Sequence, residues 1–283
     1  MCSRSAPTNE GETCMDKQVK HLLDMTGKVA VITGGFANLG FDIASALAEY
    51  GCMVVITSRK KEKAQDAAAR IQESYGVDAL GLEMDQQCYS SVSNMAERAI
   101  AWKGHVDVLV NNAGGGAGYG ECDFFKRTPE DMASMIQTNL IGALFCCQVF
   151  CRNMAQRKSG TIINLGSIAA IVGRDREMYI RGKKMQQPVD YAAAKGGVVG
   201  MTRDLAAYMA PFHVRVNALS PGAFDCHELP RTFTEAFGEA TPLGRLGQIG
   251  CDIKGAALFL ASDASAYVTG HNLVVDGGFS ICK

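Results

Sequence analysis

The feature of this sequence that most constrains its fold is the alternation of short, β-branched apolar runs with longer stretches of helical periodicity. Strands that are apolar on both faces need cover on both faces, and a parallel sheet with a helix in each connection supplies it. Strands are predicted at Lys28–Thr33, Met53–Thr57, Ala79–Glu83, Asp107–Asn111, Thr161–Leu165, Val214–Leu219 and Asn272–Asp276. Helices are predicted at Leu39–Tyr50, Lys60–Tyr75, Ser90–Trp102, Pro129–Gln156, Tyr191–Ala210 and Cys251–Ala261. The pattern predicts an α/β fold, a seven-stranded, doubly wound parallel sheet flanked by helices.

No repeat or low-complexity linker divides the 283 residues. Length alone leaves two domains open, but α/β folds of this size often form one. We therefore expect a flexible N-terminal arm over residues 1–26 and a single domain over residues 27–283. Two connections, Gly173–Val189 and Phe224–Gln248, exceed the usual loop length, as active-site lids and binding loops often do.

Charge and hydropathy exclude several classes of partner. The chain carries 28 basic and 29 acidic residues, so its net charge of −1 provides no field that attracts nucleic acid or an anionic membrane. No run approaches the roughly 18 consecutive apolar residues that span a bilayer, and the N-terminus is too polar for a secretory signal. We expect a cytoplasmic protein with a small-molecule substrate and no nucleic-acid or membrane partner.

The eleven cysteines form no C-x-x-C pair, and reduced thiols are the expected state. Cys146, Cys147 and Cys151 share one apolar helical run, where a metal or redox site competes with a role as small buried hydrophobes. No histidine lies near them in the sequence, so the second interpretation is favoured and no metal site is assigned.

A glycine-rich turn follows the first strand, with the sequence Thr33-Gly34-Gly35-Phe36-Ala37-Asn38-Leu39-Gly40. Glycines allow a tight turn and a close backbone approach, so that a pyrophosphate can sit on the N-terminus of the next helix. Such a turn can also be a simple connection. The predicted contacts to a dinucleotide in a Rossmann-type fold are Gly34, Asn38, Leu39 and Gly40.

The end of the second strand indicates which dinucleotide is bound. An acidic residue there would bind the ribose 2′-hydroxyl, whereas a basic residue accommodates a 2′-phosphate. The sequence has Ser58, Arg59 and Lys60 at this point and no carboxylate, which favours NADP(H) over NAD(H). The alternative is a solvated, lysine-rich helix start.

Further motifs follow the later strands. They are Asn111-Asn112-Ala113-Gly114, Asn164-Leu165-Gly166-Ser167, Tyr191 and Lys195 at a spacing of four, Pro221-Gly222, and Val275-Asp276-Gly277-Gly278. From Gly27 to Ser280 the chain resembles the short-chain dehydrogenase/reductase (SDR) family. The segment from Thr241 onward is similar to the gluconate 5-dehydrogenase and 3-oxoacyl-carrier-protein reductase branches. The middle glycine of the family's cofactor turn is Asn38 here, and because Asn tolerates positive φ, we expect binding to survive.

The residues themselves support acid–base chemistry. Tyr191 and Lys195 share one helical face, so an ammonium can stabilise a phenolate. Bringing a tyrosine pKa from ~10 to near 7 needs about 4 kcal/mol, which Lys195 and the nicotinamide charge can supply. Ser167 can bind the substrate oxygen, although a helix cap or turn is its alternative role.

The resemblance implies a catalytic tetrad of Asn139, Ser167, Tyr191 and Lys195, with Asn139 holding a water in the proton relay. It also implies that Asp85 contacts the adenine, that Asn112, Ala113 and Gly114 line the adenosine side, and that Pro221 and Gly222 belong to the cofactor site. The implied reaction transfers a hydride between nicotinamide and a carbonyl or secondary alcohol.

The sequence leaves three interpretations of the function open, two of which differ in the substrate. Few aromatics and many polar groups in the substrate region favour a sugar, sugar acid or polyol; the alternatives are a 3-oxoacyl thioester reductase and a non-catalytic NADP-binding regulator. A basic segment (Arg174, Arg176, Arg181, Lys183 and Lys184) and a group on the second long connection (Asp225, His227, Glu228 and Arg231) lie near the expected substrate mouth.

The resemblance implies a homotetramer, with a homodimer as the alternative. Family members pair through two long helices, which correspond here to Pro129–Gln156 and Tyr191–Ala210. The apolar residues Leu144, Phe145, Val198 and Met201 on these helices fit a core or an interface equally well.

Overall fold

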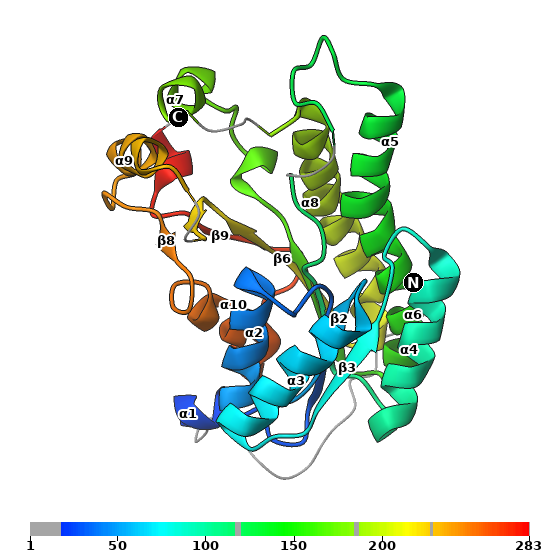
Figure 1. Ribbon diagram of the computed structural model, residues 1–283. Helices are drawn as coiled ribbons and strands as arrows, with labels where there is room; N and C mark the ends of the chain where they lie inside the picture. The colour runs from blue at the N-terminus through cyan, green and yellow to red at the C-terminus, as the bar shows by residue number, and fades with distance from the viewer. Residues whose placement is uncertain (1–17, 117–119, 184–186, 227–228, 283) are drawn as a thin grey trace, which may run out of the picture.

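A seven-stranded parallel sheet forms the centre of the computed structural model, which describes residues 18–116, 120–183, 187–226 and 229–282. Its strands are β1 (Val29–Ile32), β2 (Met53–Ser58), β3 (Ala79–Glu83), β4 (Val108–Asn111), β5 (Gly160–Leu165), β6 (Val214–Pro221) and β9 (Asn272–Val275). They lie in the order β3-β2-β1-β4-β5-β6-β9 (Figure 1). The predicted seven-stranded, doubly wound sheet is confirmed.

Helices cover both faces of the sheet (Figure 1). One face packs against α2 (Asn38–Glu49), α3 (Lys61–Tyr75) and α10 (Lys254–Ala261), and the other against α4 (Tyr89–Lys103), α6 (Gly142–Arg157) and α8 (Val189–Met209). The four residues of β1 are fully buried because they contribute alternately to the two apolar cores. This is why the strands appear in the sequence as continuous β-branched runs.

The long helix predicted over Pro129–Gln156 begins and ends close to its predicted bounds, but it is not uniform. Thr128 caps α5 (Pro129–Ile136), and a π-helical turn, η2 (Gln137–Ile141), joins α5 to α6. The whole helix, Pro129–Arg157, is long and apolar enough to cross a membrane, judged by length and composition alone. Here Cys146, Phe150 and Met154 pack its apolar face into the protein core.

The two long connections contain helices that the sequence analysis did not predict. The first holds α7 (Arg176–Arg181), and the second holds α9 (Arg231–Glu239) between β7 (Phe224–Asp225) and β8 (Gly247–Gln248). The interpretation of both segments as loops is therefore wrong. In Figure 1, α7, α9 and the C-terminal turn gather at one corner, where their apolar residues form a third core around Phe233 and Phe237.

Packing begins earlier in the chain than the predicted arm allows. Residues 1–17 lie outside the described part, but α1 (Val19–Leu22) is placed and Met25 is only 2% exposed in the core. Short 3₁₀ turns complete the fold: η3 (Ile168–Ala170), η4 (Ala210–Phe212), η5 (Asp263–Ser265) and η6 (Phe279–Cys282).

Candidate active site

A cavity of about 750 Å³ opens at the carboxyl ends of the strands, the edge where parallel α/β sheets bind ligands. It brings together most of the sequence-predicted site residues: Gly34, Asn38, Leu39, Gly40, Ser58, Arg59, Asp85, Asn112, Ala113, Gly114, Ser167, Tyr191, Lys195, Pro221 and Gly222. Two predicted residues, Lys60 and Asn139, are not part of its lining.

The glycine-rich turn has the geometry that anion binding requires. Gly34 and Asn38 both adopt positive φ, at 63° and 48°, so Asn38 takes the backbone conformation usual for the glycine it replaces. Asn112 braces the turn, because its Nδ2 donates to Thr33 O at 2.8 Å and to Gly34 O at 3.2 Å. Ala37 gives α2 no side-chain cap. The first N–H groups of α2 therefore stay available to a dinucleotide phosphate.

The end of β2 presents hydroxyl and cationic groups. Ser58 is buried and its Oγ accepts from the backbone N–H of Lys60 at 3.1 Å, whereas Arg59 is exposed and lines the cavity. Lys60 lies at the N-cap of α3, outside the lining. Of the two predicted cations, Arg59 lines the cavity and Lys60 does not.

Three predicted catalytic residues meet at the cavity wall between β5 and α8. Tyr191 is 7% exposed, and burial raises its pKa while a hydrogen bond with Ser167 opposes the rise. The Ser167 Oγ also accepts from Ala169 N at 3.1 Å, so it caps η3 as well. Lys195 Nζ donates to Leu165 O at 2.7 Å and lies 5.8 Å from the centroid of the Tyr191 ring. Burial lowers the pKa of Lys195 to about 8.

Comparison with known proteins shows the family to which this chain belongs. A protein-family model described as enoyl-(acyl carrier protein) reductase matches residues 34–280. A 3-oxoacyl-[acyl-carrier-protein] reductase of Chlamydia trachomatis is 34% identical over 259 residues, which cover 90% of this chain and 98% of that protein. The chain belongs to the short-chain dehydrogenase/reductase family. It is accordingly an oxidoreductase that acts on carbonyl or CH–OH groups.

Two further SDR relatives extend the comparison. An NADP-dependent mannitol dehydrogenase of Aureobasidium melanogenum is 31% identical, over 95% of this chain and 97% of that protein. A solved gluconate 5-dehydrogenase from Burkholderia cenocepacia, in complex with NADP and tartrate, has a TM-score of 0.82 and 32% identity. That match covers 93% of this chain and 99% of the other.

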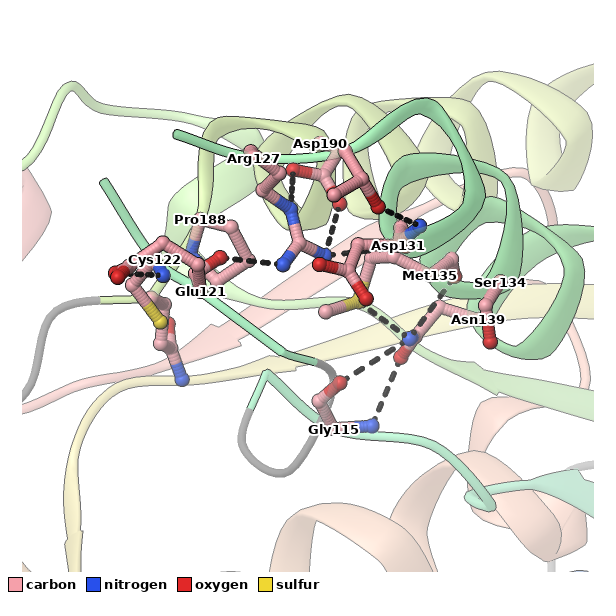
Figure 2. A network of polar contacts seen from close by, with 12 residues as sticks. Gly115, Glu121, Cys122, Arg127, Asp131, Ser134, Met135, Asn139, Pro188 and Asp190 are labelled. Carbon is pink, nitrogen blue, oxygen red and sulfur yellow. Dashed lines mark hydrogen bonds and ion pairs between the residues drawn. The ribbon is translucent and has the colours of Figure 1, made fainter. Parts of the chain in front are cut away.

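Asn139 of this SDR protein does not line the cavity but contacts Gly115 (Figure 2). It belongs to the π-helical turn and is 1% exposed. Its Oδ1 accepts from Gly115 N at 2.9 Å, and its Nδ2 donates to Gly115 O at 3.1 Å and to Met135 O at 3.2 Å. The Asn139 side chain therefore clamps the glycine-rich segment that follows β4.

A buried ion pair fixes the start of α8 beside Tyr191 (Figure 2). Arg127 Nε donates to Asp190 Oδ1, and Arg127 Nη2 donates to Asp190 Oδ2, both at 2.8 Å. Arg127 Nη1 donates to Glu121 O at 2.6 Å. The sequence gives no sign of this contact, because its partners are 63 residues apart.

The substrate side of the cavity differs from its sequence-based description. Aromatic side chains from α7, α9 and η6 line it: Tyr179, Phe233, Phe237 and Phe279. Phe237 and Phe279 stack with their centroids 4.4 Å apart and their planes at 9°. The expectation that the substrate region has few aromatic residues is therefore wrong. The four-residue spacing of Phe233 and Phe237 is the sequence pattern that would have revealed α9 and this wall.

Of the charged residues predicted near the substrate mouth, some line the cavity and others do not. Arg174 alone of the described basic residues in its segment lines the cavity, whereas Arg181 and Lys183 are exposed. Lys184, His227 and Glu228 lie outside the described residues. Asp225 and Arg231 are placed but do not line the cavity.

Proposed function

We propose that this SDR protein transfers a hydride between NADP(H) and a carbonyl or secondary alcohol, with Tyr191 as the general acid and base. The observation that carries the proposal is the meeting of Tyr191, Ser167 and Lys195 in the cavity that the glycine-rich turn also lines. When bound, the nicotinamide supplies or accepts the hydride. The residues of the chain hold the substrate and move the proton.

In the direction of reduction, the Tyr191 hydroxyl donates its proton to the substrate oxygen, and the Ser167 hydroxyl donates a hydrogen bond to the same oxygen. The phenolate that remains needs nearby positive charge. Lys195 supplies it from the next turn of α8, where Leu165 O fixes the ammonium. Asn139 is a positioning residue in this proposal, because its side chain holds Gly115 at the cavity edge.

NADP(H) is the proposed cofactor because Arg59 lines the cavity beside Ser58 and Ser58, Arg59 and Lys60 at the end of β2 include no carboxylate. Two of the relatives described above carry NADP in their names or complexes, which supports the same preference. Arg59→Gln should weaken NADPH binding about 10- to 100-fold, the value of a charge-assisted phosphate contact. NADH affinity in the same variant is the control. Equal loss for both cofactors would remove Arg59 from the proposed phosphate site.

For the substrate, we propose a sugar, sugar acid or polyol. The aromatic wall favours a second candidate, a 3-oxoacyl thioester, because an acyl chain gains from contact with Phe233 and Phe237. NADPH oxidation with keto-sugars, oxo acids and acetoacetyl thioesters distinguishes the two classes.

Tyr191→Phe tests the chemistry itself. Removing the phenol oxygen should lower kcat about 10²- to 10⁴-fold while NADPH binding is kept. Tyr179→Phe makes the same change at the other tyrosine of the lining and should leave kcat within a few-fold of wild type. Full activity in Tyr191→Phe would refute the mechanism. Binding without turnover in the wild type would point to the regulatory alternative.

We also propose a cytoplasmic homotetramer. The described cysteines are all free thiols, as expected where glutathione keeps thiols reduced. Of the four apolar residues named for the interface, Val198 is buried within the subunit, whereas Leu144 is 38% exposed and remains available for pairing. Light scattering on the purified protein measures the oligomeric state directly.

A further inference from the structure

Arg174 differs from the other described basic residues of its segment because it lines the active-site cavity. The residue is half-buried and follows η3, seven positions after Ser167. Its guanidinium carbon lies 5.5 Å from the centroid of the Tyr191 ring. A fixed positive charge therefore stands beside the proposed acid–base residue.

The guanidinium is held by one nitrogen and leaves another without a partner. Arg174 Nη1 donates to Gln187 O at 2.9 Å and to Pro188 O at 3.2 Å, which ties it to the residues just before α8. Nη2 is shielded from solvent and has no hydrogen-bond partner in the described part of the chain. Nε and Nη2 are adjacent donors on one edge, the arrangement that binds a carboxylate in a bidentate manner once the atoms that cover Nη2 move aside.

No carboxylate of the described residues compensates this charge. Asp175, the next residue, also lines the cavity, but its Oδ1 accepts from Met178 N as the cap of α7. Asp190 is engaged by Arg127. The groups whose charges act on Arg174 are Arg176, Tyr179, Tyr191 and Cys122, and burial lowers the pKa of Arg174. A partly buried cation without a counter-charge is costly, and an anion in the cavity would remove that cost.

We propose that Arg174 forms a subsite for a carboxylate of the substrate. The inference rests on the proposed function, since it places the carboxylate near the carbonyl that Tyr191 serves. It narrows the substrate class to oxo acids and the corresponding hydroxy acids, sugar acids included, with the remainder of the molecule toward the aromatic wall. A neutral sugar or polyol leaves the guanidinium of Arg174 without a counter-charge.

The test compares acids with their own methyl esters. Pyruvate, acetoacetate and levulinate set three spacings between carbonyl and carboxylate, and each methyl ester removes the charge and adds one methyl group. Binding to the enzyme with NADP(H) is measured by calorimetry, and turnover by NADPH oxidation. The wild type should prefer at least one acid over its ester about 10- to 100-fold, the range for a hydrogen-bonded charge pair.

Arg174→Met should abolish that preference by weakening the acid and leaving the ester unchanged, with the effect on KM and not on kcat. Arg174→Lys should restore part of the preference for the acid, because it returns the positive charge without the bidentate geometry of the guanidinium. Arg181→Met, an exposed arginine outside the lining, is the matched control and should behave as wild type. NADPH affinity and Tm report whether each variant is folded.

Two results would overturn the subsite. One is a wild type that binds no acid better than its ester. The other is an Arg174→Met variant that loses kcat equally on acid and ester with a shifted pH profile, which would make Arg174 a positioning residue for Tyr191. If acids bind preferentially through Arg174 but no carbonyl is reduced, the subsite stands and the proposed reaction fails.

Discussion

Removing Arg127 should destabilise the protein strongly, because it breaks the buried pair that holds the start of α8. The Arg127 side chain is 0% exposed and that of Asp190 is 10% exposed, and two hydrogen bonds of 2.8 Å join them. In Arg127→Met the Asp190 carboxylate would stay buried without its partner, and Glu121 O would lose a donor. Breaking one side of such a pair costs about 3–5 kcal/mol.

The same chain offers a matched control. Arg231 and Glu235 form an ion pair at i, i+4 on α9, but their side chains are 91% and 55% exposed. Solvent screens that pair, so Arg231→Met should cost no more than about 0.5 kcal/mol. Replacing both members of the buried pair, in Arg127→Met/Asp190→Asn, should cost less than Arg127→Met alone because no buried charge is left over.

Urea unfolding followed by circular dichroism measures all three variants at one protein concentration. A loss below about 1 kcal/mol in Arg127→Met, or equal losses in Arg127→Met and Arg231→Met, would refute the reasoning from burial. Because Asp190 directly precedes Tyr191, Arg127→Met should also lower kcat under conditions where it remains folded.

Two other groups give measurable expectations. In the cofactor-free enzyme, burial holds the Lys195 pKa at about 8 against an ordinary 10.5. Below pH 8 the lysine is charged in the folded and the unfolded protein, so burying the charge lowers the free energy of unfolding by about 3 kcal/mol. Lys195→Met should therefore be more stable than wild type in urea. That advantage should shrink as the pH rises from 8 to 10.5, and a pH-independent difference would contradict it. Iodoacetamide should label Cys88 before Cys147 in the native protein, as peptide mass spectrometry can show, because Cys88 is exposed and a hydrogen bond with Ser90 lowers its pKa, whereas burial raises the pKa of Cys147. Equal labelling rates would count against this assignment.

The sheet was predictable because its information is local. β3 has its predicted bounds, and β1 and β2 differ from theirs by one residue or less at each end, since a strand buried on both faces must be β-branched and apolar. α7 was missed because six residues carry little periodicity, and α9 was missed although Phe233 and Phe237 lie four residues apart in it. Their stability comes from a core shared with Phe279, which is distant in sequence.

That the glycine-rich turn and the Ser167, Tyr191 and Lys195 group lie together was predictable for a similar reason. Each motif sits where a strand ends or on one helical face, so topology alone brings the motifs to one edge of the sheet. The environment of these residues was not predictable. The Arg127–Asp190 pair and the contact of Arg174 with Tyr191 depend on how loops fold over that edge, and single-sequence patterns do not encode such long-range contacts.

The stack of Phe237 on Phe279 makes the substrate half of the cavity depend on a different part of the structure from the half near the glycine-rich turn. The cofactor half is built from strand ends in the centre of the sheet, where a change disturbs the whole fold. The substrate half includes the ring of Phe279, which belongs to the C-terminal turn η6 and stacks on Phe237. Substitutions in this turn can reshape the substrate wall and leave hydride transfer intact, so the turn is a place where specificity can diverge among relatives while their chemistry is inherited unchanged.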